Sequence, residues 1–95
     1  MKGTEKQIAW AQEIMERVIS VLTAIKEDRA GEVGAAELCE AKINAIRNAE
    51  HAGDIISLFK DFRLVGDLAK DAMKLAAIYK VNPGDTDGQR KILGK

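Results

Sequence analysis

The sequence predicts an all-α domain, and three observations point to that fold class. Alanine, leucine, isoleucine, glutamate and lysine dominate the chain, and these residues favour helices. Apolar residues recur at spacings of three and four, whereas the strict alternation of a half-buried strand is absent. Pro83 is the only proline, so residues 1–82 contain no residue of this helix-breaking type. We therefore expect a small helical bundle of three to four helices with a long first helix.

Length and composition fit one globular domain. The 95 residues are 46% apolar and 32% charged, which is the mixture of a soluble folded chain. No apolar run approaches the ~20 residues that span a membrane, and residues 1–3 lead directly into a helix signal rather than a secretory peptide. We expect a cytoplasmic protein with a helical domain over residues 1–81. Residues 82–95 are polar and rich in glycine, which predicts a flexible C-terminal tail.

A long helix is predicted over residues 4–29. Thr4 and Gln7 have the spacing of a capping box, in which each side chain binds the backbone N–H of the other residue. Apolar residues then follow at alternating spacings and cover an arc of roughly 160° on the helix, with Trp10 at its edge. Gly31 is the expected C′ residue after the helix.

A second helix is predicted over residues 35–52, with an alanine-rich apolar face. Cys39 lies on that face and is expected to behave as a small buried side chain. Lys42 lies in its middle, where we expect the stem to pack while the ammonium reaches water. Gly53 ends this helix and Asp54 caps the next one. His51 would then lie near the C-terminal end of the second helix.

The segment 54–80 is predicted to form two helices, with one bent helix as the alternative. Its apolar face changes direction near Gly66, and Asp67 can cap a new helix there. We favour a short helix over residues 54–62 and another over residues 67–80. Pro83 and the glycine after it prevent further extension.

The first helix also predicts self-association. A helix over residues 4–29 is about 39 Å long, whereas a compact chain of this size is about 32 Å across. The first helix would then overhang its own domain and need a second chain to cover its wide apolar arc. We expect a homo-oligomer, with a dimer favoured, or else another protein as the partner; the alternative is an elongated monomeric bundle. The expected interface residues are Ile14, Met15, Val18, Val21, Leu22 and Ile25.

No pattern typical of catalysis or metal binding is found in the chain. Cys39 and His51 would lie about 120° apart on one helix, too far round to ligate one metal ion. Phosphate-binding loops are absent, and residues 83–94 lack the first carboxylate and the final glutamate of a calcium loop. We therefore expect no enzymatic activity, no metal and no cofactor.

Cations gather on the last helix and in the tail. Arg63, Lys70 and Lys74 fall within about 40° of one another on a continuous helix, and Arg90 and Lys91 follow in the tail. Such a strip can contact phosphates, but a solvated helix face explains it as well. The 15 basic residues are balanced by 15 acidic ones, which weighs against a dedicated nucleic-acid binder. A nucleic-acid-associated accessory protein is the alternative function.

Residues 4–11, TEKQIAWA, resemble the T-x-K-Q-I-x-W-A opening of short, uncharacterised helical proteins of Gram-positive bacteria and of their prophages and mobile elements. The similarity covers residues 4–62 at most. It implies the setting of a phage or mobile-element accessory protein, but no activity and no functional residues. With the apolar arc of the first helix and the absent chemistry, it leads us to predict a small helical protein-interaction or oligomerisation module.

Overall fold

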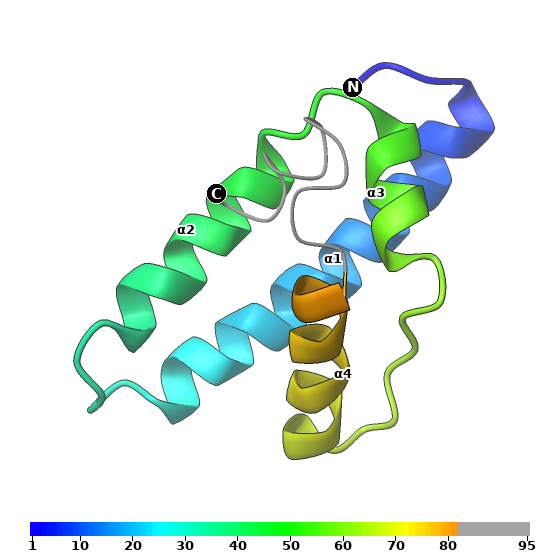
Figure 1. Ribbon diagram of the computed structural model, residues 1–95. Helices are drawn as coiled ribbons and strands as arrows, with labels where there is room; N and C mark the ends of the chain where they lie inside the picture. Colours follow the sequence, from blue (N-terminus) through cyan, green and yellow to red (C-terminus); the bar gives the residue numbers. More distant parts are fainter. Residues whose placement is uncertain (82–95) are drawn as a thin grey trace.

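The computed structural model describes residues 1–81, which form four α-helices (Figure 1). They are α1 (Glu5–Asp28), α2 (Ala35–Arg47), α3 (Ala52–Phe59) and α4 (Leu68–Val81). The all-α prediction and the long first helix are confirmed. The predicted tail over 82–95 lies outside the described residues.

Helix α1 is the central element, and each of the other three helices packs against it. Helix α2 returns alongside α1, α3 covers the N-terminal half of α1, and α4 crosses α1 further along its length (Figure 1). The hydrophobic core of residues 1–81 therefore follows α1. Its buried members are Ala11, Ile14, Val18, Val21, Leu22, Ile43, Ile46, Ala52, Ile55, Leu58, Phe59, Phe62 and Leu75.

The start of α1 agrees with the sequence prediction. The Thr4 hydroxyl accepts the backbone N–H of Gln7 at 3.1 Å, and the Gln7 side chain accepts the N–H of Thr4 at 3.1 Å. This capping box satisfies two N–H groups that a bare helix end leaves unpaired. The other end differs, because Arg29 is the C-cap of α1. The left-handed glycine of this turn is Gly34 rather than the expected Gly31, with φ of +84° just before α2.

An ion pair joins α1 to α2. The Lys26 ammonium lies 2.8 Å from the Glu40 carboxylate. This hydrogen bond raises the pKa of Lys26 and lowers the pKa of Glu40, and the attraction of the two charges adds to both shifts. A depressed carboxyl pKa stabilises the fold above the ordinary value of 4.5, and that contribution is lost as the pH falls. Both side chains are partly exposed, so water screens the pair.

The junction between α2 and α3 contradicts the predicted helix over 35–52. Helix α2 ends at Arg47. The Lys2 backbone N–H donates to the Glu50 carbonyl at 2.6 Å, and the Ala52 N–H donates to the Lys2 carbonyl at 2.8 Å. These two bonds make a short parallel bridge that holds the chain extended at His51. A backbone contact so distant in sequence is invisible to helical periodicity.

The residues around this junction change roles accordingly. His51 is the N-cap residue of α3 and has an extended backbone, so it does not belong to α2. Gly53 and Asp54 lie in the first turn of α3 instead of separating two helices. The carboxylate of Asp54 is still well placed there, because the N-terminus of a helix carries partial positive charge.

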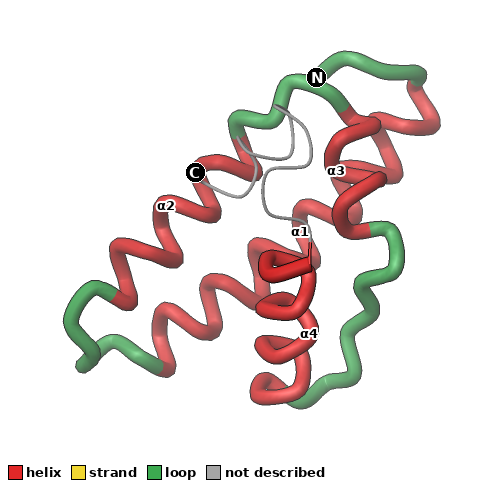
Figure 2. The backbone as a smooth tube through the Cα atoms, in the orientation of Figure 1, coloured by secondary structure: helices red, strands yellow, loops and turns green. Residues whose placement is uncertain are grey.

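The segment 54–80 forms two helices, α3 and α4, and not one bent helix; Figure 2 shows the long loop between them. Gly66 has φ of +83°, a left-handed conformation that favours glycine. The Asp67 side chain accepts the N–H groups of Ala69 at 3.0 Å and Lys70 at 3.2 Å, which confirms Asp67 as a helix cap. Phe62 lies in this loop rather than in α3, yet it is buried.

Candidate functional site

The apolar face of α1 is covered by helices of its own chain. The molecule is 40 Å along its longest axis, an extent that includes α1, whose 24 residues are about 36 Å long. Because α2, α3 and α4 pack on α1, its apolar face does not need a second chain to cover it, and self-association itself stays a prediction. The six predicted interface residues come together within the core of one chain. Met15 and Ile25 are partly buried there. The other four are buried, and they are Ile14, Val18, Val21 and Leu22.

An apolar groove lies between α2 and α4, with α1 as its floor. Its volume is about 150 Å³. Leu38 of α2 lies on its wall with 58% of its surface exposed, although leucine is a residue that usually packs inside. Alanine at positions 72 and 76 of α4 leaves the groove open, because these side chains end at Cβ. The deeper lining is Leu22, Ile25, Cys39, Leu75 and Tyr79.

Lys42 and Tyr79 connect α2 to α4 at this groove. The Lys42 ammonium lies 4.1 Å from the centre of the Tyr79 ring, a cation–π contact. The same ring packs edge-on against Phe59 of α3, with ring centres 6.2 Å apart. Lys42 is half-buried, which agrees with its place on an alanine-rich face. The contact of its ammonium with an aromatic ring could not be predicted from the sequence.

The Tyr79 hydroxyl is buried and has no hydrogen-bond partner among the described residues. Replacing Tyr79 with phenylalanine keeps the ring and removes the unsatisfied hydroxyl. We therefore expect Tyr79→Phe to leave the free energy of unfolding unchanged or to raise it by up to about 1 kcal/mol at neutral pH. Denaturant unfolding measures this change. A clear loss of stability would show that the hydroxyl has a partner.

Alkaline pH provides a second readout of the same variant. Burial raises the pKa of Tyr79 above its ordinary value of 10.0. As the pH rises past that value, the unfolded chain loses the phenol proton while the folded chain keeps it, so the stability of the wild type falls. The Tyr79→Phe variant lacks this contribution and should lose less stability over the same alkaline range.

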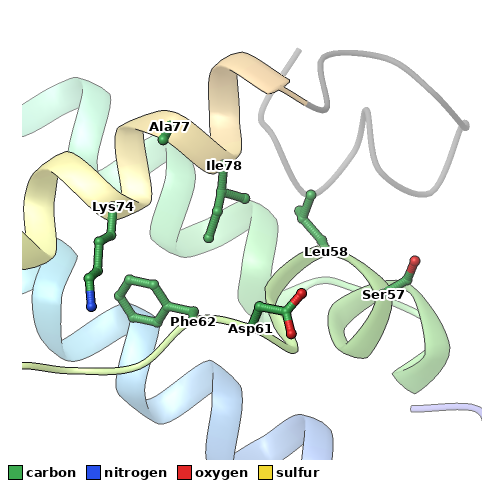
Figure 3. Close-up of a pocket in the computed structure, with 7 residues that line it drawn as sticks. All are labelled: Ser57, Leu58, Asp61, Phe62, Lys74, Ala77 and Ile78. Carbon is green, nitrogen blue, oxygen red and sulfur yellow. The ribbon is translucent and has the colours of Figure 1, made fainter.

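A second hollow, the α3–α4 cleft, lies on the other side of α4 (Figure 3). Its volume is about 490 Å³. Leu58, Phe62 and Ile78 form its apolar part, and Ser57 and Ala77 complete its walls. Figure 3 shows the Asp61 carboxylate and the Lys74 ammonium on either side of the Phe62 ring. Periodicity did not indicate this cleft, because Asp61 and Phe62 belong to a loop and not to the predicted helix over 54–62.

Two contacts hold the loop that forms one wall of this cleft. The Asp71 carboxylate accepts the Val65 N–H at 2.9 Å, and the Arg17 guanidinium donates to the Phe62 carbonyl at 3.4 Å. Asp71 is a buried acidic residue in the first turn of α4. The sequence analysis missed its role, although one signal was available: Asp71 shares the helical stripe of Leu68 and Leu75.

The predicted cationic strip does not lie on one continuous helix, because Arg63 is in the loop before α4 whereas Lys70 and Lys74 are in α4. The Lys74 ammonium donates to the Arg63 carbonyl at 3.3 Å, and the Arg63 guanidinium donates to the Lys60 carbonyl at 3.5 Å. Lys70 is exposed on α4. Arg90 and Lys91 lie outside the described residues, so the strip is described only from Arg63 to Lys74.

Residues with potential for covalent or metal chemistry are separated in the fold. Cys39 is free and buried in α2, whereas His51 is exposed at the α2–α3 junction, so the two do not share a helix as predicted. Within residues 1–81, no three His, Cys, Asp or Glu side chains gather to hold a metal ion.

The remaining observations concern the ability of the helices to cross a membrane and the similarity of the chain to known proteins. Over the described range, none of the helices combines the length and the apolar character needed to cross a bilayer. Comparison of the chain with protein-family models, with curated proteins and with solved structures found no match. The two hollows beside α4 and the side chains around them are therefore the candidate functional sites.

Proposed function

We propose that the protein is a small helical interaction module that self-associates through the apolar groove between α2 and α4. The exposed leucine at this groove is the observation that carries the proposal. Leu38 shows 58% of its surface to water beside a hollow lined almost wholly by apolar side chains. Covering such a surface is favourable by about 25 cal/mol per Å² of apolar area removed from water.

The dimensions of the groove suit a second copy of the chain. A volume of about 150 Å³ is enough for one small apolar group such as a leucine side chain. Because Leu38 lies beside the groove that it would fill on another copy, two copies related by a twofold axis can make the contact reciprocally. The interface therefore needs no residues beyond those around this one groove.

Charge gives little preference for one arrangement of the two copies. Helix α2 carries Glu37 and Glu40 against Lys42 and Arg47, so it has no net charge, whereas α4 carries a basic excess. The apolar groove, and not charge, therefore carries the proposed contact.

Replacing Leu38 with glutamate should abolish this self-association without unfolding the chain. The new carboxylate would be desolvated in the partner's groove, whereas in the monomer it remains in water. Light scattering after size exclusion, over a series of protein concentrations, should show a dimer for the wild type and a folded monomer for Leu38→Glu.

Val33→Glu is the matched control for this experiment. Val33 is fully exposed in the turn between α1 and α2 and does not line the groove, so the same added charge should leave the dimer intact. A wild-type chain that stays monomeric at every concentration, or a Leu38→Glu variant that still forms dimers, would refute the proposed interface.

The opening of α1 supports a biological setting for this module. Residues 4–11 resemble the start of short helical proteins of Gram-positive bacteria and of their prophages and mobile elements, which implies the setting of an accessory protein. In this chain the same residues cap α1 and contribute Ile8 and Ala11 to its packing. The resemblance thus fits the fold and adds a setting rather than an activity.

Nucleic-acid contact is the second candidate function, and the bond from the Lys74 ammonium to the Arg63 backbone carbonyl, which places Lys74 beside the loop that carries Arg63, favours it. If this surface binds phosphates, affinity for a mixed-sequence duplex should fall steeply as salt rises. Changing Arg63, Lys70 and Lys74 to glutamine should then weaken binding and reduce the salt slope by about one per lost contact. Absence of binding at low salt would eliminate this function.

A further inference from the structure

We infer that the α3–α4 cleft is a binding site for a small zwitterion with an apolar body, such as a free apolar amino acid or a short peptide. This inference is independent of self-association, because the α3–α4 cleft and the α2–α4 groove share no lining residue. It rests on the shape of the cleft, on the placement of its two charges, and on the absence of any hydrogen bond or ion pair between one of them and another residue of the described range.

The shape of the cleft suits a small organic molecule. Its volume of about 490 Å³ falls within the roughly 300–1,000 Å³ typical of small-molecule sites. Ile78 and Ala77 supply apolar surface against which an aliphatic or aromatic group can pack. Leu58 and Phe62 lie beneath them with only 5% and 2% of their surface exposed. The contact with these side chains would account for the apolar part of the ligand.

The two charges define the polar part of the ligand. Asp61 and Lys74 lie on either side of the Phe62 ring (Figure 3). A simple carboxylate would be attracted to Lys74 and repelled by Asp61, and a simple amine would meet the reverse. A molecule that carries both an ammonium and a carboxylate can pair with both groups at once.

The loop contacts leave these charges able to bind. The Lys74 ammonium donates one hydrogen bond to the Arg63 carbonyl and, with three donors in all, has two more to offer. The Asp61 carboxylate makes no hydrogen bond or ion pair with any other described residue. Asp71 and Arg17 hold the loop in place from the core side, so the cleft exists before a ligand arrives.

Titration with phenylalanine, followed by amide-resolved NMR, tests the inference. Two analogues separate the contributions: phenethylamine lacks the carboxylate and phenylpropionate lacks the ammonium. Because both side chains are exposed to water, we expect weak binding with a dissociation constant of about 1–10 mM. Phenylalanine should shift amides of residues 57–62 and 74–78, and each analogue should bind up to about fivefold more weakly.

Three variants identify the site. Lys74→Gln and Asp61→Asn should each weaken phenylalanine binding up to about fivefold, and Ala77→Leu should block it by filling the cleft while keeping both charges. Lys70→Gln and Asp28→Asn are matched controls, because both residues are exposed and lie outside the cleft. Spectra of the free variants verify that each remains folded.

The inference is overturned if phenylalanine shifts no cleft amide in the folded wild type. It is also overturned if either single-charge analogue binds as tightly as phenylalanine, or if Ala77→Leu binds normally. Loss of dimerisation in Leu38→Glu has no bearing on these results, so the two proposals fail separately.

Discussion

Replacing Phe59 with alanine is expected to lower the free energy of unfolding by about 3–5 kcal/mol. Phe59 has no surface exposed to water and packs edge-on against Tyr79. Its ring thus connects α3 to α4 within the core beside α1. Because a domain of this kind is stable by only about 5–15 kcal/mol, the variant should lose a large share of its stability.

Two companion variants make this result specific. Phe59→Leu retains most of the apolar volume and should lose clearly less stability, about 1–2 kcal/mol. Trp10→Ala removes a larger ring that is 48% exposed and should have a smaller effect than Phe59→Ala. Denaturant unfolding followed by circular dichroism measures all three. Equal losses for Phe59→Ala and Trp10→Ala would contradict the placement of the core.

Replacing Asp71 with alanine is expected to lower the free energy of unfolding by about 1–3 kcal/mol. Asp71 is only 5% exposed, and its carboxylate accepts the Val65 N–H that shapes the loop between α3 and α4. It also lies in the first turn of α4, where a negative charge is favourable. Alanine removes both contributions and leaves the Val65 N–H without its acceptor.

The amide variant separates these two contributions. Asp71→Asn keeps an acceptor oxygen but loses the charge, so its loss of stability should be smaller than that of Asp71→Ala. Thermal and denaturant unfolding give the comparison, and NMR shifts of residues 63–66 report on the loop. If Asp71→Ala is as stable as the wild type, the carboxylate does not hold this loop.

The helices could be predicted wherever local signals decide them. The capping box of Thr4 and Gln7 and the cap at Asp67 are confirmed, because each involves residues within one turn. The end of α2 could not be predicted, because the apolar period continues through Ala49 and Ala52. In the structure, hydrogen bonds to the backbone of Lys2 hold this part of the chain in an extended bridge instead. A contact across so much sequence leaves no periodic signature.

The candidate site was less accessible to sequence reasoning than the fold. The wide apolar arc of α1 was correctly recognised, but the sequence could not show whether helices of the same chain or of another chain cover it. The two hollows depend on how α4 crosses α1. Because of that crossing, Leu38 lines the α2–α4 groove, and Asp61 and Lys74 line the α3–α4 cleft. Composition and spacing do not reveal these positions.

Amide hydrogen exchange along α1, measured in the Leu38→Glu variant over a series of protein concentrations, tests the central claim most directly. That claim is that one chain covers the apolar face of α1 by itself. The core-facing amides from Ala11 to Leu22 should then keep the same protection at every concentration, because folding does not depend on a second copy. Protection that decreases on dilution would contradict the claim and show that the face of α1 is completed by another chain.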